Sequence, residues 1–224
     1  MEKKLVSNFQ RIKVGNAFAI GGMIGAGKST LSRALGNALD AAVVYELKED
    51  DHLQDFLLKK MYEGDKVSAI TFQVYFFCNR FENYKIKSSA NKLHVFDRTI
   101  FEDRLFAHQN MIDNPVVFKF YEGIWQEKAK QLIYSVGVPK LYIILDIKWD
   151  DFKKRLFERG RKSETDNFNE NEMYFKAIHD GYTDYLVKIC QTYDINYIII
   201  DANIPTDKQV EIIINKSKEL KILD

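Results

Sequence analysis

Short apolar runs alternate along the chain with longer stretches in which apolar residues recur at helical spacing. The runs at 17–20, 42–45, 93–96, 141–145 and 197–200 are continuous, as is typical of parallel strands covered on both faces. Helices are predicted over 28–39, 50–63, 67–87, 99–111, 116–135, 149–159, 169–191 and 206–220. The alternation predicts one α/β domain over 1–224, with a five-stranded parallel sheet flanked by helices.

Composition and charge exclude several classes of protein. The 33 basic and 32 acidic side chains give a net charge of +1, so no global charge attracts nucleic acid or a membrane. No apolar run approaches the roughly 18 residues of a membrane-spanning helix. Cys78 and Cys190 have no CxxC spacing, and the four histidines have no metal-ligand spacing. We therefore expect a cytoplasmic protein without disulfides or structural zinc, and with neither a nucleic-acid nor a membrane partner.

Residues 22–29 match the phosphate-binding pattern G-x-x-x-x-G-K-[ST] without a mismatch. A predicted strand precedes the motif and a predicted helix follows it, which favours phosphate binding over a glycine-rich turn without function. Lys28 would reach the β- and γ-phosphates, and the Ser29 hydroxyl would hold Mg²⁺. The predicted nucleotide-binding residues are Gly22, Met23, Ile24, Gly25, Ala26, Gly27, Lys28, Ser29 and Thr30. The sequence thus predicts a P-loop NTPase fold that binds ATP.

Acidic residues follow or end four of the five predicted strands: Glu46, Asp97, Asp146 and Asp201. The carboxyl ends of parallel strands line the ligand crevice of such a sheet. Glu46 is a candidate base for an acceptor hydroxyl, or alternatively a solvated acid among Glu49, Asp50 and Asp51. Asp97 could hold Mg²⁺ while Arg98 binds phosphate or orients Glu46; the alternative is a structural Asp97–Arg98 ion pair.

A basic cluster around Gly160 contains Arg155, Arg159 and Arg161. Arg155 and Arg159 are four residues apart on one helical face, and Gly160 then ends the helix. Residues 155–168 are predicted to form a lid that closes arginines over phosphates. A solvated helix end is the alternative, and nucleic-acid binding is a weaker one. In the aromatic-rich segment 62–81, Gln73 carries an amide with the donor and acceptor that a nucleobase edge requires.

The chain resembles the deoxynucleoside kinase family over most of its length, from the phosphate loop to about Glu164 and more loosely beyond. The motifs that carry the resemblance occur in the family's order and spacing. They are the phosphate loop, Glu46 after the second strand, Met61-Tyr62-Glu63, Phe72-Gln73-x-Tyr75 with Arg80, Asp97-Arg98-Thr99 with Asp103, and Arg159-Gly160-Arg161 with Glu164.

This resemblance implies a role for each matching residue. Glu46 would accept the proton of the nucleoside 5′-hydroxyl, Arg98 would bridge Glu46 to the reacting phosphate, and Asp97 would be the metal-linked acid. The substrate-binding residues would be Glu46, Tyr62, Gln73, Arg80, Arg98, Asp103 and Glu164, with Tyr62 and Glu164 on the sugar 3′-hydroxyl. Arg155, Arg159 and Arg161 would form the lid. The family is commonly dimeric, so a homodimer is expected.

The sequence therefore predicts an ATP- and Mg²⁺-dependent kinase that acts on the 5′-hydroxyl of a deoxynucleoside, with a purine as the expected base. Two alternatives remain open: a nucleoside monophosphate kinase, and a P-loop ATPase or switch. The first would need an extra basic site for the acceptor phosphate. Against the second, the sequence has neither an NKxD motif nor a glycine after Asp97.

Overall fold

The computed structural model describes residues 12–46, 51–88 and 91–223. Five parallel strands form one sheet in the order β2-β3-β1-β4-β5. The strands are β1 (Ala17–Gly22), β2 (Ala42–Val44), β3 (His94–Asp97), β4 (Leu141–Asp146) and β5 (Tyr197–Asp201). The predicted α/β fold with a five-stranded parallel sheet is confirmed.

The helices agree with the predicted periodic stretches apart from one short helix. They are α1 (Lys28–Ala38), α2 (His52–Tyr62), α3 (Lys66–Ser88), α4 (Ile100–Asn110), α5 (Pro115–Ser135), α6 (Trp149–Arg159), α7 (Lys162–Thr165), α8 (Phe168–Thr192) and α9 (Thr206–Glu219). Helix α7 was not predicted, because four residues are too few to show a helical period. It follows Gly160, whose φ of 64° ends α6 in the left-handed region.

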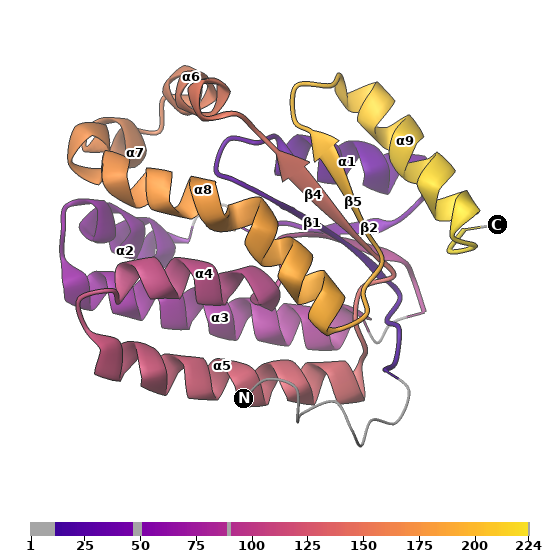
Figure 1. Ribbon diagram of the computed structural model, residues 1–224, viewed down its shortest axis with the longest axis horizontal. Helices are drawn as coiled ribbons and strands as arrows, with labels where there is room; N and C mark the ends of the chain where they lie inside the picture. The colour runs from indigo at the N-terminus through magenta and orange to yellow at the C-terminus, as the bar shows by residue number, and fades with distance from the viewer. Residues whose placement is uncertain (1–11, 47–50, 89–90, 224) are drawn as a thin grey trace.

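Helices cover both faces of the sheet (Figure 1). Helices α1 and α9 pack together on one face, and α3, α4, α5 and α8 form the layer on the other. Helix α2 packs on α3, and α7 contacts both α2 and α6. Among the described residues, no helix combines the length and apolarity needed to cross a membrane.

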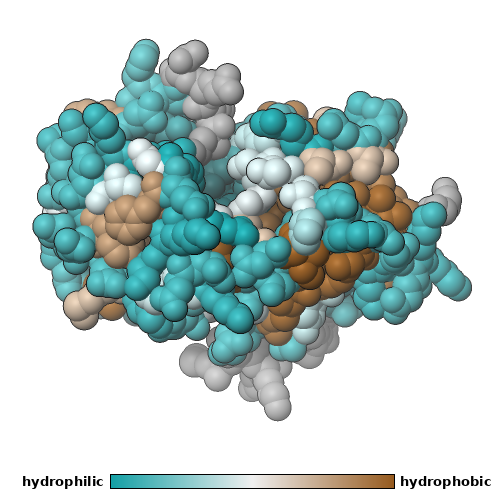
Figure 2. Space-filling model, turned by 90° about the horizontal axis from the view of Figure 1, so that it is seen from above, coloured by the Kyte–Doolittle hydropathy of each residue, from teal (hydrophilic) through white to brown (hydrophobic). Residues whose placement is uncertain are grey.

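Burial is greatest in the middle of the sheet and falls toward its edges. All six residues of β1 are buried, whereas Ile199 in the edge strand β5 is 47% exposed. Seen from above, apolar side chains gather over the part of the molecule that contains β5 and α9 (Figure 2). The continuous apolar runs predicted strands buried on both faces. This is correct for the central strand β1, whereas the edge strand β5 is more exposed than predicted.

The strand order places the functional loops at one end of the sheet. Strand β1 lies between β3 and β4, with Ile20 in register with Asp97 and Gly22 in register with Leu145. The loop after β1 and the residues after β3 therefore leave the sheet side by side. In α/β sheets this is the point at which strand order reverses and a ligand crevice opens.

Candidate active site

The loop between β1 and α1 has the geometry of an anion site. Gly25 and Gly27 have φ values of 75° and 94°, in the left-handed region that favours glycine. Helix α1 begins at Lys28 with no side-chain cap and no acidic residue in its first turn. Its first N–H groups have no intrahelical partners, and the helix dipole adds positive potential at this end. An anionic group is therefore favoured here.

Lys28 is buried beneath this loop, where its Nζ donates a 3.0 Å hydrogen bond to the carbonyl oxygen of Met23. Burial, with a contribution from the positive charge of Arg98, lowers the pKa of Lys28 to about 8. The carboxylates of Asp97 and Glu46 oppose this shift. Lys28 is therefore positively charged at neutral pH, and an anion bound at the loop would raise its pKa and favour the charged form further.

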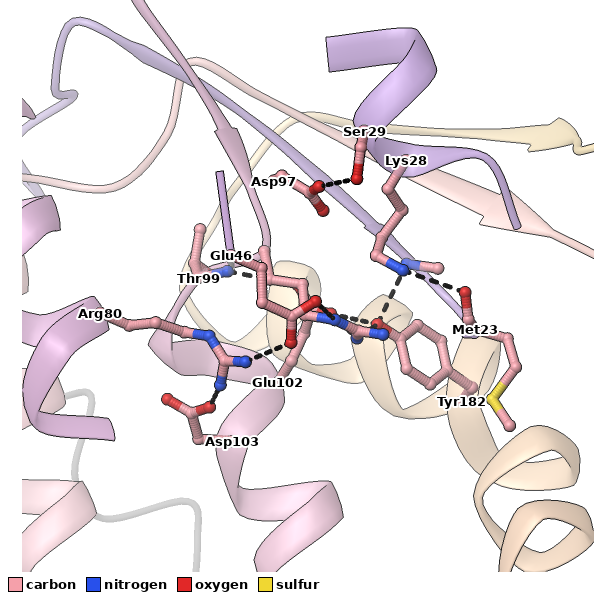
Figure 3. A network of polar contacts seen from close by, with 12 residues as sticks. Met23, Lys28, Ser29, Glu46, Arg80, Asp97, Thr99, Glu102, Asp103 and Tyr182 are labelled. Atoms are coloured by element: carbon pink, nitrogen blue, oxygen red, sulfur yellow. Dashed lines mark hydrogen bonds and ion pairs between the residues drawn. The ribbon is translucent and has the colours of Figure 1, made fainter. Parts of the chain in front are cut away.

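Ser29 and Asp97 meet beside the loop, with Ser29 Oγ donating to Asp97 Oδ2 at 2.5 Å (Figure 3). Asp97 Oδ1 is buried and has no hydrogen-bond partner among the described residues. Burial raises the pKa of Asp97. Asp97 and Arg98 form no ion pair with each other, so the structural ion pair considered from the sequence is absent. A hydroxyl and a carboxylate oxygen are ligands of the type that Mg²⁺ prefers.

Glu46 is held between two guanidinium groups. Arg98 Nε donates to Glu46 Oε2 at 2.9 Å, and Arg80 Nη2 donates to Glu46 Oε1 at 2.5 Å. Burial alone would raise the pKa of Glu46, but Arg98, Arg80 and Lys28 together bring it down to about 2. The alternative of a solvated acid is wrong, because both carboxylate oxygens are paired. Of the acids grouped with it, Glu49 and Asp50 lie outside the described residues, and Asp51 caps α2.

Arg98 has an unusual backbone conformation at the end of β3. Its φ is 70°, a region that costs a residue with a side chain on the order of 1–3 kcal/mol. Its backbone N–H is nevertheless bonded to the carbonyl oxygen of Ile20 at 3.0 Å, and its guanidinium lies 4.8 Å from the ring centre of Phe106. The side chain is 2% exposed. This conformation turns the guanidinium toward Glu46.

A cavity of about 780 Å³ opens next to Glu46. That volume is within the range of small-molecule sites. Of the residues expected to contact a substrate, the cavity is lined by Glu46, Tyr62, Gln73, Arg80, Arg98 and Glu164. Asp103 is fully buried behind it and forms an ion pair with Arg80. Burial raises the pKa of Tyr62, and the nearby carboxylate of Glu164 raises it further.

The three arginines of the basic cluster have different hydrogen-bond partners. Arg159 and Arg161 both pair with the buried carboxylate of Glu164, the second at 3.2 Å. Arg155 instead donates to the carbonyl oxygen of Ala202 and to Asn203 Oδ1, each at 2.9 Å. The structure therefore separates Arg155 from the other two, because its acceptors lie in the β5–α9 connection and, at 3.4 Å, on the carbonyl oxygen of Ala26 in the phosphate loop.

Sequence reasoning missed two buried residues behind Arg98. Glu102 accepts a hydrogen bond from Arg98 Nη1 at 2.6 Å, and the Tyr182 hydroxyl accepts another at 2.6 Å. Thr99-x-x-Glu102 is a capping-box pattern, and both of its hydrogen bonds are present at the start of α4. The local pattern thus signals the cap but not the contact with Arg98. Tyr182 carries no local signal, since it comes from α8.

Comparison with known proteins agrees with these features. The family model described as deoxynucleoside kinase matches residues 18–222. An uncharacterized protein of Mycoplasma genitalium is 44% identical over 96% of this chain and 95% of its own. The deoxyguanosine kinase of Lactobacillus johnsonii is 30% identical over 71% of each chain.

A solved structure shares the fold. It is that of deoxyadenosine kinase from M. mycoides with dCMP and dCDP bound, with a TM-score of 0.73. The two chains are 24% identical, and the match covers 91% of this chain and 99% of the other. At that identity the likeness establishes the P-loop architecture.

Proposed function

The chain belongs to the deoxynucleoside kinase family and is a phosphotransferase, and from this premise we propose that it transfers the γ-phosphoryl group of ATP to the 5′-hydroxyl of a purine deoxynucleoside. One observation carries the proposal. The carboxylate of Glu46 stands where the cavity meets the phosphate loop, paired with Arg98 on one side and Arg80 on the other.

The donor side would bind the triphosphate through the loop from Gly22 to Thr30. Lys28 would contact the β- and γ-phosphates, where negative charge develops during transfer. Ser29 and Asp97 would hold Mg²⁺, since the unpartnered Oδ1 of Asp97 offers a ligand and Mg²⁺ commonly uses few protein carboxylates. When bound, the metal would neutralise charge on the phosphate oxygens.

The transfer itself uses Glu46 and Arg98. The hydroxyl oxygen bonds to the γ-phosphorus, its proton passes to Glu46, and the bond from the γ-phosphorus to the β–γ bridging oxygen breaks. A carboxylate with a pKa of about 2 is a weak base. It suits a loose transition state, in which the hydroxyl becomes acidic only when the new bond has largely formed. Arg98 would stabilise the transferred group while keeping Glu46 aligned.

The acceptor side favours a purine. Gln73 is buried at the cavity wall with an amide that both donates and accepts, and Arg80 lines the same cavity, backed by its ion pair with the fully buried Asp103. Such groups complement the ring nitrogens and exocyclic group of adenine or guanine. The methyl group of thymine would lie against a charged pair without compensation. The expected order of kcat/KM is deoxyadenosine or deoxyguanosine, then deoxycytidine, then thymidine. Its gap to thymidine should be at least about tenfold.

The segment with Arg159 and Arg161 would close over the donor phosphates. Both guanidinium groups contact Glu164, which lines the cavity together with them. Their exposed fractions, 36% and 37%, leave donors available to a phosphate. The division of the chain as one domain with a lid over 155–168, the homodimer and the cytoplasmic location stay predictions; light scattering of the purified protein checks the dimer.

The test is a panel assay. The purified protein is incubated with ATP and Mg²⁺ and with each deoxynucleoside or nucleoside monophosphate, and ADP release and the phosphorylated product are followed. We expect deoxynucleoside 5′-monophosphates from nucleosides, with no turnover of monophosphates and loss of activity in EDTA. Phosphorylation of monophosphates alone would support the monophosphate kinase, and ADP release without any acceptor would support an ATPase.

A further inference from the structure

Glu102 is a fully buried carboxylate whose hydrogen-bonding capacity is used by four donors. Its Oε2 accepts from Arg98 Nη1 and from the Tyr182 hydroxyl. Its Oε1 accepts from the Tyr142 hydroxyl at 2.7 Å and from the backbone N–H of Thr99 at 3.3 Å. A buried carboxylate that accepts this many hydrogen bonds restrains the positions of the groups that donate to it. The group held closest to the reacting centre is Arg98.

Tyr182 connects this carboxylate to the phosphate loop. Its hydroxyl accepts from the backbone N–H of Gly22 at 3.0 Å and from Arg98 Nη1 at 2.6 Å, and it donates to Glu102. Helix α8 approaches β1 closely enough for this because Gly21 has no side chain. A Cβ there would lie 2.6 Å from Leu186 of α8. One hydroxyl therefore touches both the first glycine of the loop and the arginine that aligns Glu46.

We propose that Tyr182 and Glu102 are positioning residues that hold Arg98 in its left-handed backbone conformation and tie it to the phosphate loop. The inference rests on the proposed role of Arg98 in phosphoryl transfer. Neither residue lines the cavity, so both act on the reaction through the groups that they contact, Arg98 in both cases and Gly22 for Tyr182 as well. Their loss should therefore lower kcat and leave binding of the deoxynucleoside largely intact.

The first experiment compares two tyrosines of α8. Tyr182→Phe should lower kcat by about tenfold or more, with the KM for deoxynucleoside changed less than about twofold. Tyr185→Phe is the matched control, because its hydroxyl donates to the carbonyl oxygen of Phe101 at 2.8 Å and does not contact Arg98. It should keep kcat within about twofold while losing comparable thermal stability. Equal kcat values in the two variants would overturn the proposal.

The second experiment is a double-mutant cycle with Arg98→Lys. A lysine ammonium cannot hold Glu46, Glu102 and Tyr182 together as the guanidinium does. If Tyr182 acts through Arg98, adding Tyr182→Phe to Arg98→Lys should cause little further loss of kcat. If the two substitutions lower kcat by independent factors that multiply in the double variant, the proposal is overturned. A normal kcat in Arg98→Lys alone would contradict the proposed role of Arg98, and the inference with it.

Should Tyr182→Phe fail to fold, Glu102→Gln tests the same link. The amide keeps the shape of the side chain but gives up the charge that pairs with Arg98. A fall in kcat of about tenfold or more with an unchanged deoxynucleoside KM is expected. A folded Glu102→Gln protein with full kcat would overturn the proposal.

Discussion

The donor and acceptor halves of the site are built in different ways. The proposed donor half is a continuous stretch, residues 22–30, in which backbone N–H groups and two positive-φ glycines would do most of the binding. The acceptor half is made of side chains from separate elements: Glu46 after β2, Gln73 and Arg80 on α3, and Asp103 on α4.

This difference predicts how each half responds to mutation. Where the backbone does the binding, only substitution of the few charged side chains should abolish activity. Where ion pairs share residues, substitution of one residue should also disturb the partners of that residue. Arg80 is the link in the acceptor half, since it pairs with both Glu46 and Asp103. With the proposed roles of these residues, base recognition and proton transfer would be connected through one guanidinium.

The largest effect is expected at the junction of the two halves. Glu46→Gln keeps the shape but cannot accept the hydroxyl proton, so kcat should fall by about 10²–10⁴ with nucleoside binding largely retained. Steady-state kinetics with each substrate varied in turn separate the change in kcat from any change in KM. Glu122→Gln is the control, because Glu122 also pairs with an arginine, at 2.7 Å, but lies outside the cavity. Full activity in Glu46→Gln would remove the base from the mechanism.

In the donor half, Lys28→Ala should lower kcat by about 10²–10³, because the positive charge facing the transferred phosphoryl group is lost. Folding should survive, since within the described part of the chain the side chain makes one hydrogen bond, to Met23. Circular dichroism and turnover are measured together, with the exposed Lys208→Ala as control. Near-normal turnover would contradict the phosphate-loop assignment.

Base selectivity tests the acceptor half alone. In Asp103→Ala, Arg80 loses one partner and keeps Glu46, so purine use should fall by about tenfold more than thymidine use. Competition among the four deoxynucleosides at equal concentration gives the ratio. Asp113→Ala removes an exposed aspartate paired with Lys66 and should leave the ratio unchanged. Thymidine as the best substrate of the unmodified protein would contradict this view of the pocket.

The smallest effect is a pH dependence confined to the donor half. Lys28 has a pKa lowered to about 8, so it loses its charge as the pH rises through that value. The Kd for an unreactive ATP analogue should rise several-fold between about pH 7 and 9. Lys28→Arg, which stays charged, should lack this rise. Titration calorimetry at several pH values measures it, and a flat profile for the unmodified protein would contradict the assignment.

The sequence by itself determined the sheet, its helices and the donor loop. Continuous apolar runs, helical periodicity and the G-x-x-x-x-G-K-S motif are local patterns, and the structure confirms the elements they predict. The pairing of Glu46 with Arg80 and Arg98 was not readable in this way, although the resemblance named all three residues. They are brought together only by the strand order and by α3.

Tertiary structure alone decided the surroundings of Arg98 and the separation of Arg155. Tyr182 lies 160 residues after Gly22, and no local period relates the two. Arg155 and Arg159 lie at helical spacing, yet their partners come from different parts of the chain: the β5–α9 and phosphate loops for Arg155, and α7 for Arg159. The physical reason is the same in both cases. Local patterns fix backbone conformation, whereas side-chain partners are set by which distant elements the parallel sheet and its helices bring within hydrogen-bonding distance.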